Sequence, residues 1–331
     1  MAGLFKPSTQ KILELFNGVL NMPINTNQTT DLNRFQNRPK SSAKIAFELS
    51  DALYKMDDLV LPIKTKADLE RTIGLRQYQS EVFEHWGFSE THKFDNKMII
   101  NLYGEPGTGK TMSAHAIAHA LGKKLILINY GDIESKYVGE TPKNIQAAFE
   151  FAKENDAILF FDEADAILSR RVTNMTSATD TSVNQTRSVM LTLLNDYNDT
   201  VIFATNFISN YDPAFMRRIL IHIEYTLPDE ETRTYLFNKY IPNKLPHSID
   251  LPTIVKLSEG LSGSDISNAI LLAAFSAKTE GCDLVTHENL QNKIEAIQRS
   301  KSENSRKETK FQTRVVSEEY VKSQLNDGET I

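Results

Sequence analysis

Gly104-Glu105-Pro106-Gly107-Thr108-Gly109-Lys110-Thr111 is the stretch from which the organisation of this 331-residue chain can be read. It matches the pattern G-x-x-x-x-G-K-[ST] of a phosphate-binding loop at every fixed position. Residues 98–103 before it are apolar and β-prone, whereas residues 112–121 after it are Ala-rich with helical spacing and a stop at Gly122. Strand, glycine loop and helix therefore follow one another in the order that phosphate binding requires.

Each residue type of the loop has a physical reason. Glycines let the backbone curl so that its N–H groups point at phosphate oxygens. The helix that opens at Gly109–Lys110, and continues through Met112, adds the positive end of its dipole. We expect Lys110 to reach the β- and γ-phosphates of a nucleotide, and the Thr111 hydroxyl to ligate Mg²⁺.

The composition is typical of a soluble globular protein with two domains. Hydrophobic residues make up 40% and charged residues 24%, and the net charge is -6. This balance, without a long basic run, argues against a nucleic-acid scaffold. The single cysteine, Cys282, excludes an internal disulfide. With neither a signal core nor an apolar run of membrane-spanning length, the sequence predicts a cytoplasmic protein that has no membrane partner.

The apolar runs predict an α/β fold: a doubly wound parallel sheet of the P-loop NTPase type, followed by a small all-helical lid domain. Further strands are expected at 125–128, 157–161, 201–204 and 219–225, separated by helices at 112–121, 142–153 and 185–196. These runs are continuous rather than alternating, as in strands that are covered on both faces. Beyond residue 228 we expect only helices, at 230–240, 250–258, 264–280 and 286–299.

These patterns divide the chain into four parts. Residues 1–67 are an N-terminal helical or flexible segment, 68–228 the large nucleotide-binding domain, 229–299 the lid, and 300–331 a charged tail. The first part includes an amphipathic stretch within residues 1–22 and a helix expected from Ser41 or Ser42 to Met56, with Ile45, Leu49 and Leu53 on one side. The tail is expected to carry a short helix near 317–325 or to be disordered.

Two acids end the third apolar run. Asp162 follows a strand beside the phosphate loop, where a carboxylate can hold the water shell of Mg²⁺. Glu163 is the residue that can polarise a water molecule for attack on the γ-phosphate. This pair, at this distance from the loop, predicts nucleotide hydrolysis rather than a solvated turn.

Taken together, the motifs resemble those of the AAA+ ATPases of the AAA clade, which contains katanin, the proteasomal ATPases and the membrane-protease ATPases. The resemblance covers residues 68–298. It implies a five-stranded Rossmann-like domain with a helical lid, and ATP and Mg²⁺ as ligands. It also implies a homo-oligomer, usually a ring hexamer, with nucleotide between subunits.

The resemblance assigns further site residues. Asn206 matches the sensor position that bonds the attacking water and the γ-phosphate, and the stretch 212–218 resembles the one that carries arginine fingers. Here the usual Pro-Gly between arginines is missing and Ile221 stands near the second finger position. We favour Arg218, with Arg217 as the close alternative.

Two further matches concern the adenine base of the nucleotide and the lid domain. Leu261-Ser262-Gly263-Ser264-Asp265 resembles the second sensor region, in which small residues such as Gly263 and Ser264 let the lid helix approach the nucleotide. Ile73-Gly74 resembles the segment that packs on adenine.

Lys136, Tyr137 and Val138 resemble the aromatic pore loop of the family, which implies that tyrosines facing the ring axis grip an extended polypeptide. The polar stretch 170–183 fits a second, flexible axial loop that we do not expect to be ordered. The resulting hypothesis is an ATP-hydrolysing ring motor that threads, unfolds or disassembles a protein substrate. The N-terminal segment is expected to select that substrate, and an adaptor or the product of a neighbouring gene is left open as a further partner.

Two other functions stay open. A nucleic-acid motor or loader is expected to have basic residues in its pore loop, but this chain has Tyr137 and Val138 there. A nucleotide-dependent interaction switch with slow hydrolysis is disfavoured by the intact pair Asp162 and Glu163 and by Asn206.

Overall fold

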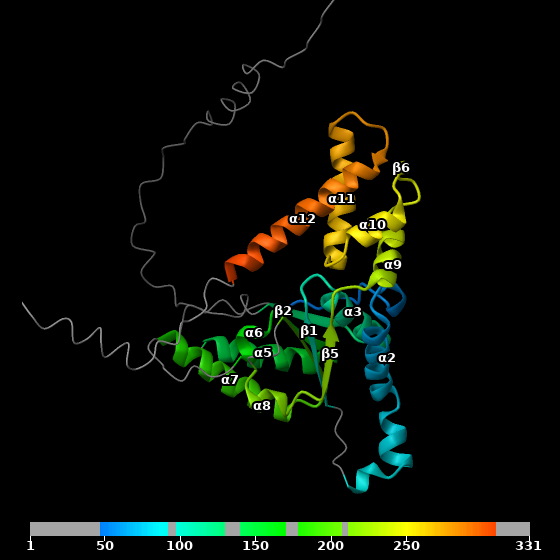
Figure 1. Ribbon diagram of the computed structural model, residues 1–331. Helices are drawn as coiled ribbons and strands as arrows, with labels where there is room; N and C mark the ends of the chain where they lie inside the picture. Colours follow the sequence, from blue (N-terminus) through cyan, green and yellow to red (C-terminus); the bar gives the residue numbers. More distant parts are fainter. Residues whose placement is uncertain (1–46, 92–96, 130–139, 170–177, 207–210, 309–331) are drawn as a thin grey trace, which may run out of the picture. The chain divides into compact units, whose positions relative to one another are not determined.

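The computed structural model describes residues 47–91, 97–129, 140–169, 178–206 and 211–308. The chain divides into two compact units, residues 1–44 and 45–331, and the described residues all belong to the second. Within it, an α/β part is followed along the chain by a helical part (Figure 1).

A five-stranded parallel sheet forms the centre of the α/β part. Its strands are β1 (Met98–Gly104), β2 (Leu125–Asn129), β3 (Ile158–Asp162), β4 (Thr200–Thr205) and β5 (Ile221–Tyr225), in the order β2-β3-β4-β1-β5. The doubly wound sheet expected from the sequence is confirmed. Because β1 lies next to β4 and one strand from β3, the carboxyl ends of these three strands meet at one edge.

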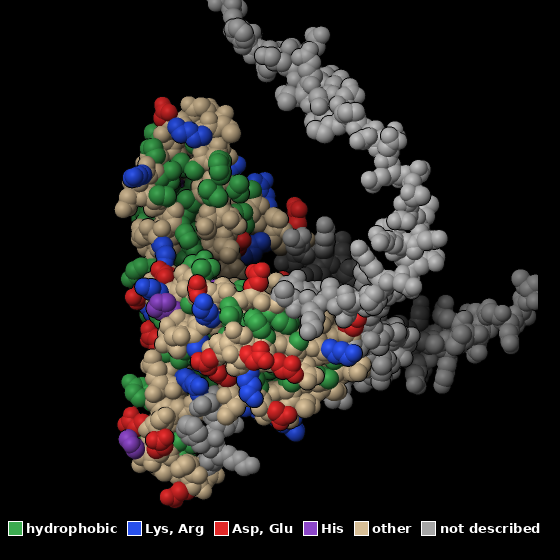
Figure 2. Space-filling view, turned by 180° about the vertical axis from the view of Figure 1, so that it is seen from behind, with side chains coloured by type: hydrophobic (Ala, Val, Ile, Leu, Met, Phe, Trp, Pro, Cys, Tyr) green, Lys and Arg blue, Asp and Glu red, His purple; other side chains and the backbone are tan. Residues whose placement is uncertain are grey.

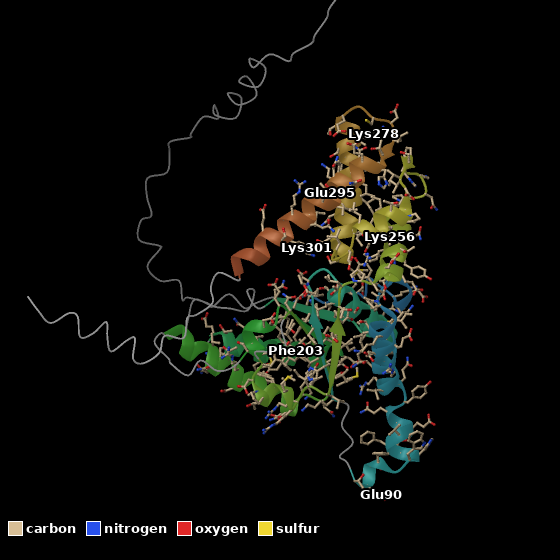
Figure 3. The ribbon with its side chains drawn as sticks, viewed as in Figure 1. Glu90, Phe203, Lys256, Lys278, Glu295 and Lys301 are labelled. Carbon is tan, nitrogen blue, oxygen red and sulfur yellow. The ribbon has the colours of Figure 1, made fainter. Side chains whose placement is uncertain are left out.

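Helices cover both faces of the sheet, as the continuous apolar runs require. On one face, α2 (Ile63–Gln77) and α3 (Lys110–Ala120) pack on a core that includes Ile100 and Phe160. On the other, α5 (Glu140–Glu154), α6 (Asp165–Leu168), α7 (Ala178–Asp196) and α8 (Pro213–Met216) enclose a second core. Phe203 of β4 is fully buried there and stacks on Phe161 (Figure 3).

The helical part has a hydrophobic core of its own. It consists of α9 (Glu230–Tyr240), α10 (Leu251–Leu257), α11 (Gly263–Thr279) and α12 (His287–Glu308). Helix α11 is apolar on its outer side as well, where Leu271, Leu272 and Phe275 are exposed. Figure 2 shows hydrophobic side chains gathered over this part of the molecule.

The expected helix from Ser41 or Ser42 to Met56 is wrong over its described residues. Residues 47–55 are not helical, and Ser50 forms an antiparallel bridge to Leu125 through N–H···O bonds of 2.8 and 2.9 Å. As an edge strand, β2 has backbone groups that need partners, and this segment supplies them. Leu49 and Leu53, expected on one side of that helix, are exposed.

Between that segment and β1 lie three short helices. They are η1 (Met56–Asp58), a π-helix η2 (Glu81–His85) and η3 (Phe88–Glu90). Leu59 and Leu61, just after η1, belong to the core beneath α2, and α2 itself begins at Ile63. The packed structure therefore starts before residue 68.

Other expectations need adjustment. The helical part contains two short parallel strands, β6 (His247–Ser248) and β7 (Val285–Thr286), where only helices were expected. Helix α7 begins at Ala178, inside the stretch expected to be a flexible loop, while 170–177 lie outside the described residues.

Helix α12 continues to Glu308, past the expected start of the tail at residue 300. Its extension has a partner, because Lys301 Nζ bonds Asp265 Oδ2 at 2.7 Å (Figure 3). The helix expected near 317–325 lies outside the described residues.

Candidate nucleotide-binding site

The loop of residues 104–111 has the backbone that its glycines predict. Gly104, Gly107 and Gly109 have φ of +131°, +73° and +104°, in the region that side chains with a Cβ rarely adopt. A Cβ on Gly104 would lie 2.1 Å from the carbonyl oxygen of Tyr225 on the neighbouring strand. Gly109 caps α3, whose first residue is Lys110.

Lys110 is the central cation of the site. Its Nζ donates to the carbonyl oxygens of Gly104 at 2.6 Å and Glu105 at 3.0 Å, and to Asn206 Oδ1 at 3.0 Å. Burial lowers the pKa of Lys110, and the nearby carboxylates of Asp162, Asp165 and Glu105 oppose that shift. A bound phosphate would act in the same direction as the carboxylates.

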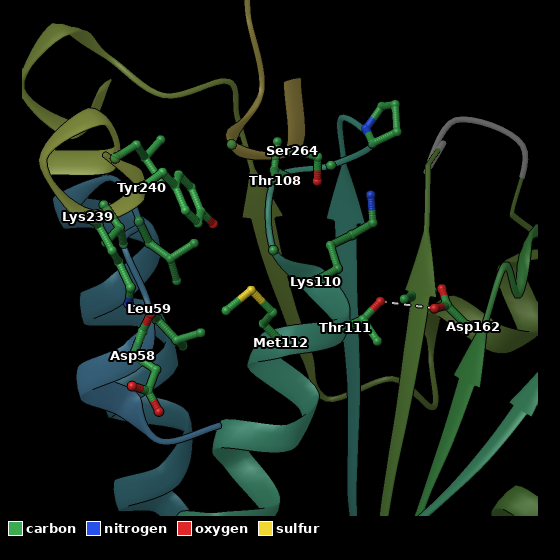
Figure 4. Close-up of a pocket in the computed structure, with 18 of the residues that line it drawn as sticks. Asp58, Leu59, Thr108, Lys110, Thr111, Met112, Asp162, Lys239, Tyr240 and Ser264 are labelled. Atoms are coloured by element: carbon green, nitrogen blue, oxygen red, sulfur yellow. Dashed lines mark hydrogen bonds between the residues drawn. The ribbon is translucent and has the colours of Figure 1, made fainter. Parts of the chain in front are cut away.

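Two side-chain oxygens that could bind a metal ion lie next to each other at the loop. The Thr111 hydroxyl donates to Asp162 Oδ2 at 3.0 Å (Figure 4). Hydroxyl and carboxylate oxygens are ligands that Mg²⁺ prefers, so the pair fits the metal site expected from the sequence. The other oxygen of Asp162 accepts the N–H of Glu163 at 2.9 Å.

Glu163 stands at the end of β3 with a φ of +50°, unusual for a residue that is not glycine. Its side chain is exposed and lines the same pocket as Lys110 and Asp162. A strained backbone that presents a carboxylate into a cleft is typical of functional sites.

Asn206 follows β4, between the ends of β1 and β3. Its side chain bonds Lys110, and its backbone N–H donates to Asp165 Oδ2 at 3.2 Å. The structure therefore brings together Lys110, Thr111, Asp162, Glu163 and Asn206, which the sequence singled out by the glycine-loop motif, the acid pair and the family resemblance.

The pocket around these residues has a volume of about 310 Å³ and also contacts the helical part. Gly263 and Ser264, at the start of α11, line it, and the Ser264 N–H donates to the Gly107 carbonyl at 3.1 Å. A Cβ on Gly263 would lie 3.6 Å from the Gly107 carbonyl oxygen and from Leu236, which is ordinary van der Waals contact, so the start of α11 lies close to the loop. Pro106, Thr108 and Met112 complete the loop side of the lining.

Ile73 and Gly74 do not line this pocket. Ile73 is buried in the core on α2, and Gly74 lies on a separate apolar cavity of about 1030 Å³ between α2, η2 and the start of β1. The resemblance to the family segment that packs on adenine predicted the Ile-Gly pair beside the base, but on α2 the pair lies away from this pocket.

The residues that line the apolar end of the pocket were missed. They come from the segment before α2 and from α9: Asp58, Leu59, Val60, Leu61, Leu236, Lys239 and Tyr240 (Figure 4). The Lys239 ammonium bonds the Asp58 carbonyl and so ties the two segments together. The one available signal was the apolar run Leu59-Val60-Leu61 directly before Pro62.

The two arginines differ in their surroundings. Arg218 Nε donates to Asn195 Oδ1 at 2.8 Å and its Nη1 to the Ala214 carbonyl at 2.7 Å, so its guanidinium is bound within its own chain. Arg217 is exposed at the end of α8. Neither lines the pocket of its own chain. Lys136, Tyr137 and Val138 lie outside the described residues.

The sheet order, the glycine loop and the acid after β3 define a P-loop nucleotide-binding domain of the α/β class. Residues 100–227 match the family "ATPase family associated with various cellular activities (AAA)". The chain therefore carries an AAA-family ATPase domain. No helix among the described residues is long and apolar enough to cross a membrane.

Curated relatives point to the same family. The chain is 37% identical over 238 residues to the proteasome-activating nucleotidase of Saccharolobus islandicus, covering 70% of this chain and 59% of that protein. It is 32% identical over 238 residues to the 26S proteasome subunit RPT4 of Saccharomyces cerevisiae, covering 70% and 53%. The chain thus spans little more than half the length of these relatives.

The contact between the loop and α11 gives a testable prediction. In Gly107→Ala, the new Cβ would lie 2.6 Å from Ser262 Oγ and 3.1 Å from Ser264 Cβ. We expect roughly tenfold weaker binding of a fluorescent ATP analogue, because α11 must move away from the loop.

Gly122→Ala is the matched control. Gly122 has a similar φ of +66°, but a Cβ there would meet nothing within 4 Å. This variant should lose about 1–2 kcal/mol of stability through backbone strain and bind nucleotide normally. Equal nucleotide affinity of the two variants would contradict the role of the contact.

Proposed function

We propose that this protein hydrolyses ATP and that it works as a ring oligomer that remodels a protein substrate. One observation carries the proposal: the bonds Lys110–Asn206 and Thr111–Asp162 join three strand ends around one pocket. Three kinds of group then lie around the phosphate-binding loop: a cation, two oxygens suited to bind a metal ion, and an exposed carboxylate. These are the groups that phosphoryl transfer to water requires.

Each residue has a role in that reaction. The N–H groups of the loop and Lys110 bind the phosphates, and Lys110 exchanges its bonds to Gly104 and Glu105 for phosphate oxygens. Mg²⁺ held by Thr111 and Asp162 would neutralise charge on the β- and γ-phosphates. Glu163 accepts the proton of the attacking water as general base, and Asn206 orients that water.

The apolar end of the pocket is suited to the adenine base. Leu59, Met112 and Tyr240 present apolar and aromatic surface on the side of the loop away from Asp162 (Figure 4), and Leu61 also lines the pocket. The base would join the segment before α2 to α9, so that bound nucleotide holds the helical part against the α/β part.

The arginine stretch supports nucleotide at a subunit interface. Since Arg218 is bound to Asn195 and Ala214, we propose that it holds this segment in place. The exposed Arg217 then donates its guanidinium to the γ-phosphate in the neighbouring subunit, where it stabilises charge in the transition state. A ring, with six subunits as in the implied family, follows from repeating this head-to-tail contact.

The substrate proposal rests on the sequence and on the relatives. Tyr137, with Lys136 and Val138, would line the axis and grip an extended polypeptide. The relatives are a proteasome-activating nucleotidase and a proteasome subunit by name, which supports a protein substrate over nucleic acid. A cytoplasmic location, and an adaptor or the product of a neighbouring gene as a further partner, belong to the same proposal.

The domain division is proposed with one change. The large domain ends at residue 228 and the lid begins at 229, as expected from the sequence. The large domain begins before Leu59 rather than at residue 68, because Leu59 belongs to its core. The segment that precedes it would select the substrate.

Glu163→Gln tests the hydrolytic mechanism. Turnover should fall by about a hundredfold or more because the general base is lost, whereas ATP should still bind and support oligomerisation. Glu150→Gln is the control: Glu150 is exposed on α5 and does not line the pocket, so turnover should stay near normal. Steady-state phosphate release measures both, and normal turnover of Glu163→Gln would remove Glu163 from the mechanism.

Arg217→Ala tests the interface. Turnover should fall by about a thousandfold with ATP binding retained. Mixing this variant with Glu163→Gln should restore activity, because the second variant offers Arg217 to sites that keep Glu163. Arg218→Ala should lower the thermal midpoint more than Arg217→Ala. Full turnover of the strict monomer, or no rescue on mixing, counts against a shared site.

Tyr137→Ala tests the substrate class. In the Glu163→Gln background with ATP, affinity capture should retain protein, and adding Tyr137→Ala should reduce that amount severalfold. Tyr235→Ala is the control, since Tyr235 is an exposed aromatic residue of α9. Capture of nucleic acid instead, or unchanged capture with Tyr137→Ala, would refute the pore-loop assignment.

A further inference from the structure

Three buried polar side chains meet behind the end of β4. The hydroxyls of Thr205 and Tyr211 are hydrogen-bonded to each other, and each lies 3.3 Å from Asn101 Oδ1. Two hydroxyl protons serve these three contacts, so one hydroxyl donates to the other while the second donates to Asn101. We call these three residues the β4 network.

The network lies within an apolar core. Asn101, Thr205 and Tyr211 are 0%, 1% and 4% exposed, and Phe203 and Phe215 belong to the same buried region. Asn101 Nδ2 is buried and has no hydrogen-bond partner among the described residues. Burial raises the pKa of Tyr211 to about 12, so its hydroxyl keeps its proton at neutral pH.

We expect the fold to form without these polar groups. Leu, Val and Phe at the three positions would fill similar space without a buried amide that lacks a partner. A polar network in such a place gives directional contacts rather than added stability.

The network joins the two ends of the segment 206–211. Thr205 directly precedes Asn206, whose side chain bonds Lys110. Tyr211 forms an antiparallel bridge to Ser169 and directly precedes Asp212, whose N–H donates to the Leu168 carbonyl at 2.9 Å. The far end of the segment is therefore fixed to the chain after α6, and the network fixes the near end to the far end.

We propose that Asn101, Thr205 and Tyr211 are positioning residues that hold Asn206 in the orientation required for hydrolysis. The inference rests on the proposed ATPase function and extends it to residues that touch neither the pocket nor the nucleotide. We expect the network to act mainly on the rate of the chemical step, because the loop and Lys110 bind the phosphates whereas Asn206 orients the attacking water.

Tyr211→Phe and Thr205→Val in the full-length chain test this role. Each should lower kcat by roughly tenfold, about the effect of losing one orienting hydrogen bond, with KM and ATP-analogue affinity within twofold of wild type. The thermal midpoint should stay level or rise, because apolar groups replace polar ones. Thr205→Ser keeps the hydroxyl and should retain most of the rate, even if Tyr211→Phe fails to fold.

Tyr197→Phe is the matched control. Tyr197 is a buried tyrosine of the same core, and its hydroxyl donates to the Ala157 carbonyl at 3.4 Å. It is not part of the β4 network, so its removal should leave kcat unchanged.

A double-mutant cycle separates positioning from a general structural effect. In an Asn206→Ala background, Tyr211→Phe should cause no further loss of kcat, because the residue it positions is gone. The inference would be overturned if Tyr211→Phe and Thr205→Val both left kcat unchanged in the presence of Asn206. It would also be overturned if Tyr211→Phe lowered kcat equally with Asn206 and with Asn206→Ala. A wild-type chain that does not hydrolyse ATP would instead refute the proposed function, and this inference with it.

Discussion

The buried ammonium of Lys110 is the constraint on which the site depends. A cation removed from water needs oxygen partners, and here two come from the loop backbone and one from Asn206. The loop can supply its carbonyls only because Gly104 and Gly109 take left-handed conformations. The ammonium thus joins the loop to the end of β4, and phosphate oxygens are suited to replace its two backbone partners, Gly104 and Glu105.

The parallel sheet brings residues that are distant in the sequence together around Lys110. Lys110 and Asn206 are 96 positions apart, and Thr111 and Asp162 are 51 apart, yet each pair is in direct contact. Their strands are neighbours or next neighbours, and all end at the same edge. The helical part contacts the pocket at two places, through the backbone bond from Ser264 to Gly107 and through the bond from Lys239 to the Asp58 carbonyl. Both contacts lie at the rim of the pocket, so a bound nucleotide would lie between the two parts.

The chain after β4 links the site to the proposed interface. Asn206 faces Lys110, the β4 network fixes the segment behind it, and Asp212 then caps α8 before the arginines. Arg218 is bound back to α7 through Asn195, which leaves Arg217 at the surface. In our proposal, one short stretch therefore orients the water in its own subunit and presents a guanidinium to the next.

The sequence alone predicted the sheet, most helices of both parts and the polar residues that gather beside the glycine loop, because a glycine loop and acids at strand ends are local patterns with few structural solutions. It expected Ile73-Gly74 to pack on the nucleotide base, whereas Ile73 is buried in a core and it is Leu59 to Leu61, packed beside α9, that line the pocket. It also missed the strand-like pairing of Ser50 with Leu125. The apolar spacing around Ser50 is typical of a helix, but the unpaired backbone of the edge strand β2 binds this segment in an extended form. Nor could it show that Asn101 and Tyr211 share a buried network, since contacts between residues 110 positions apart are decided by tertiary packing rather than by local spacing.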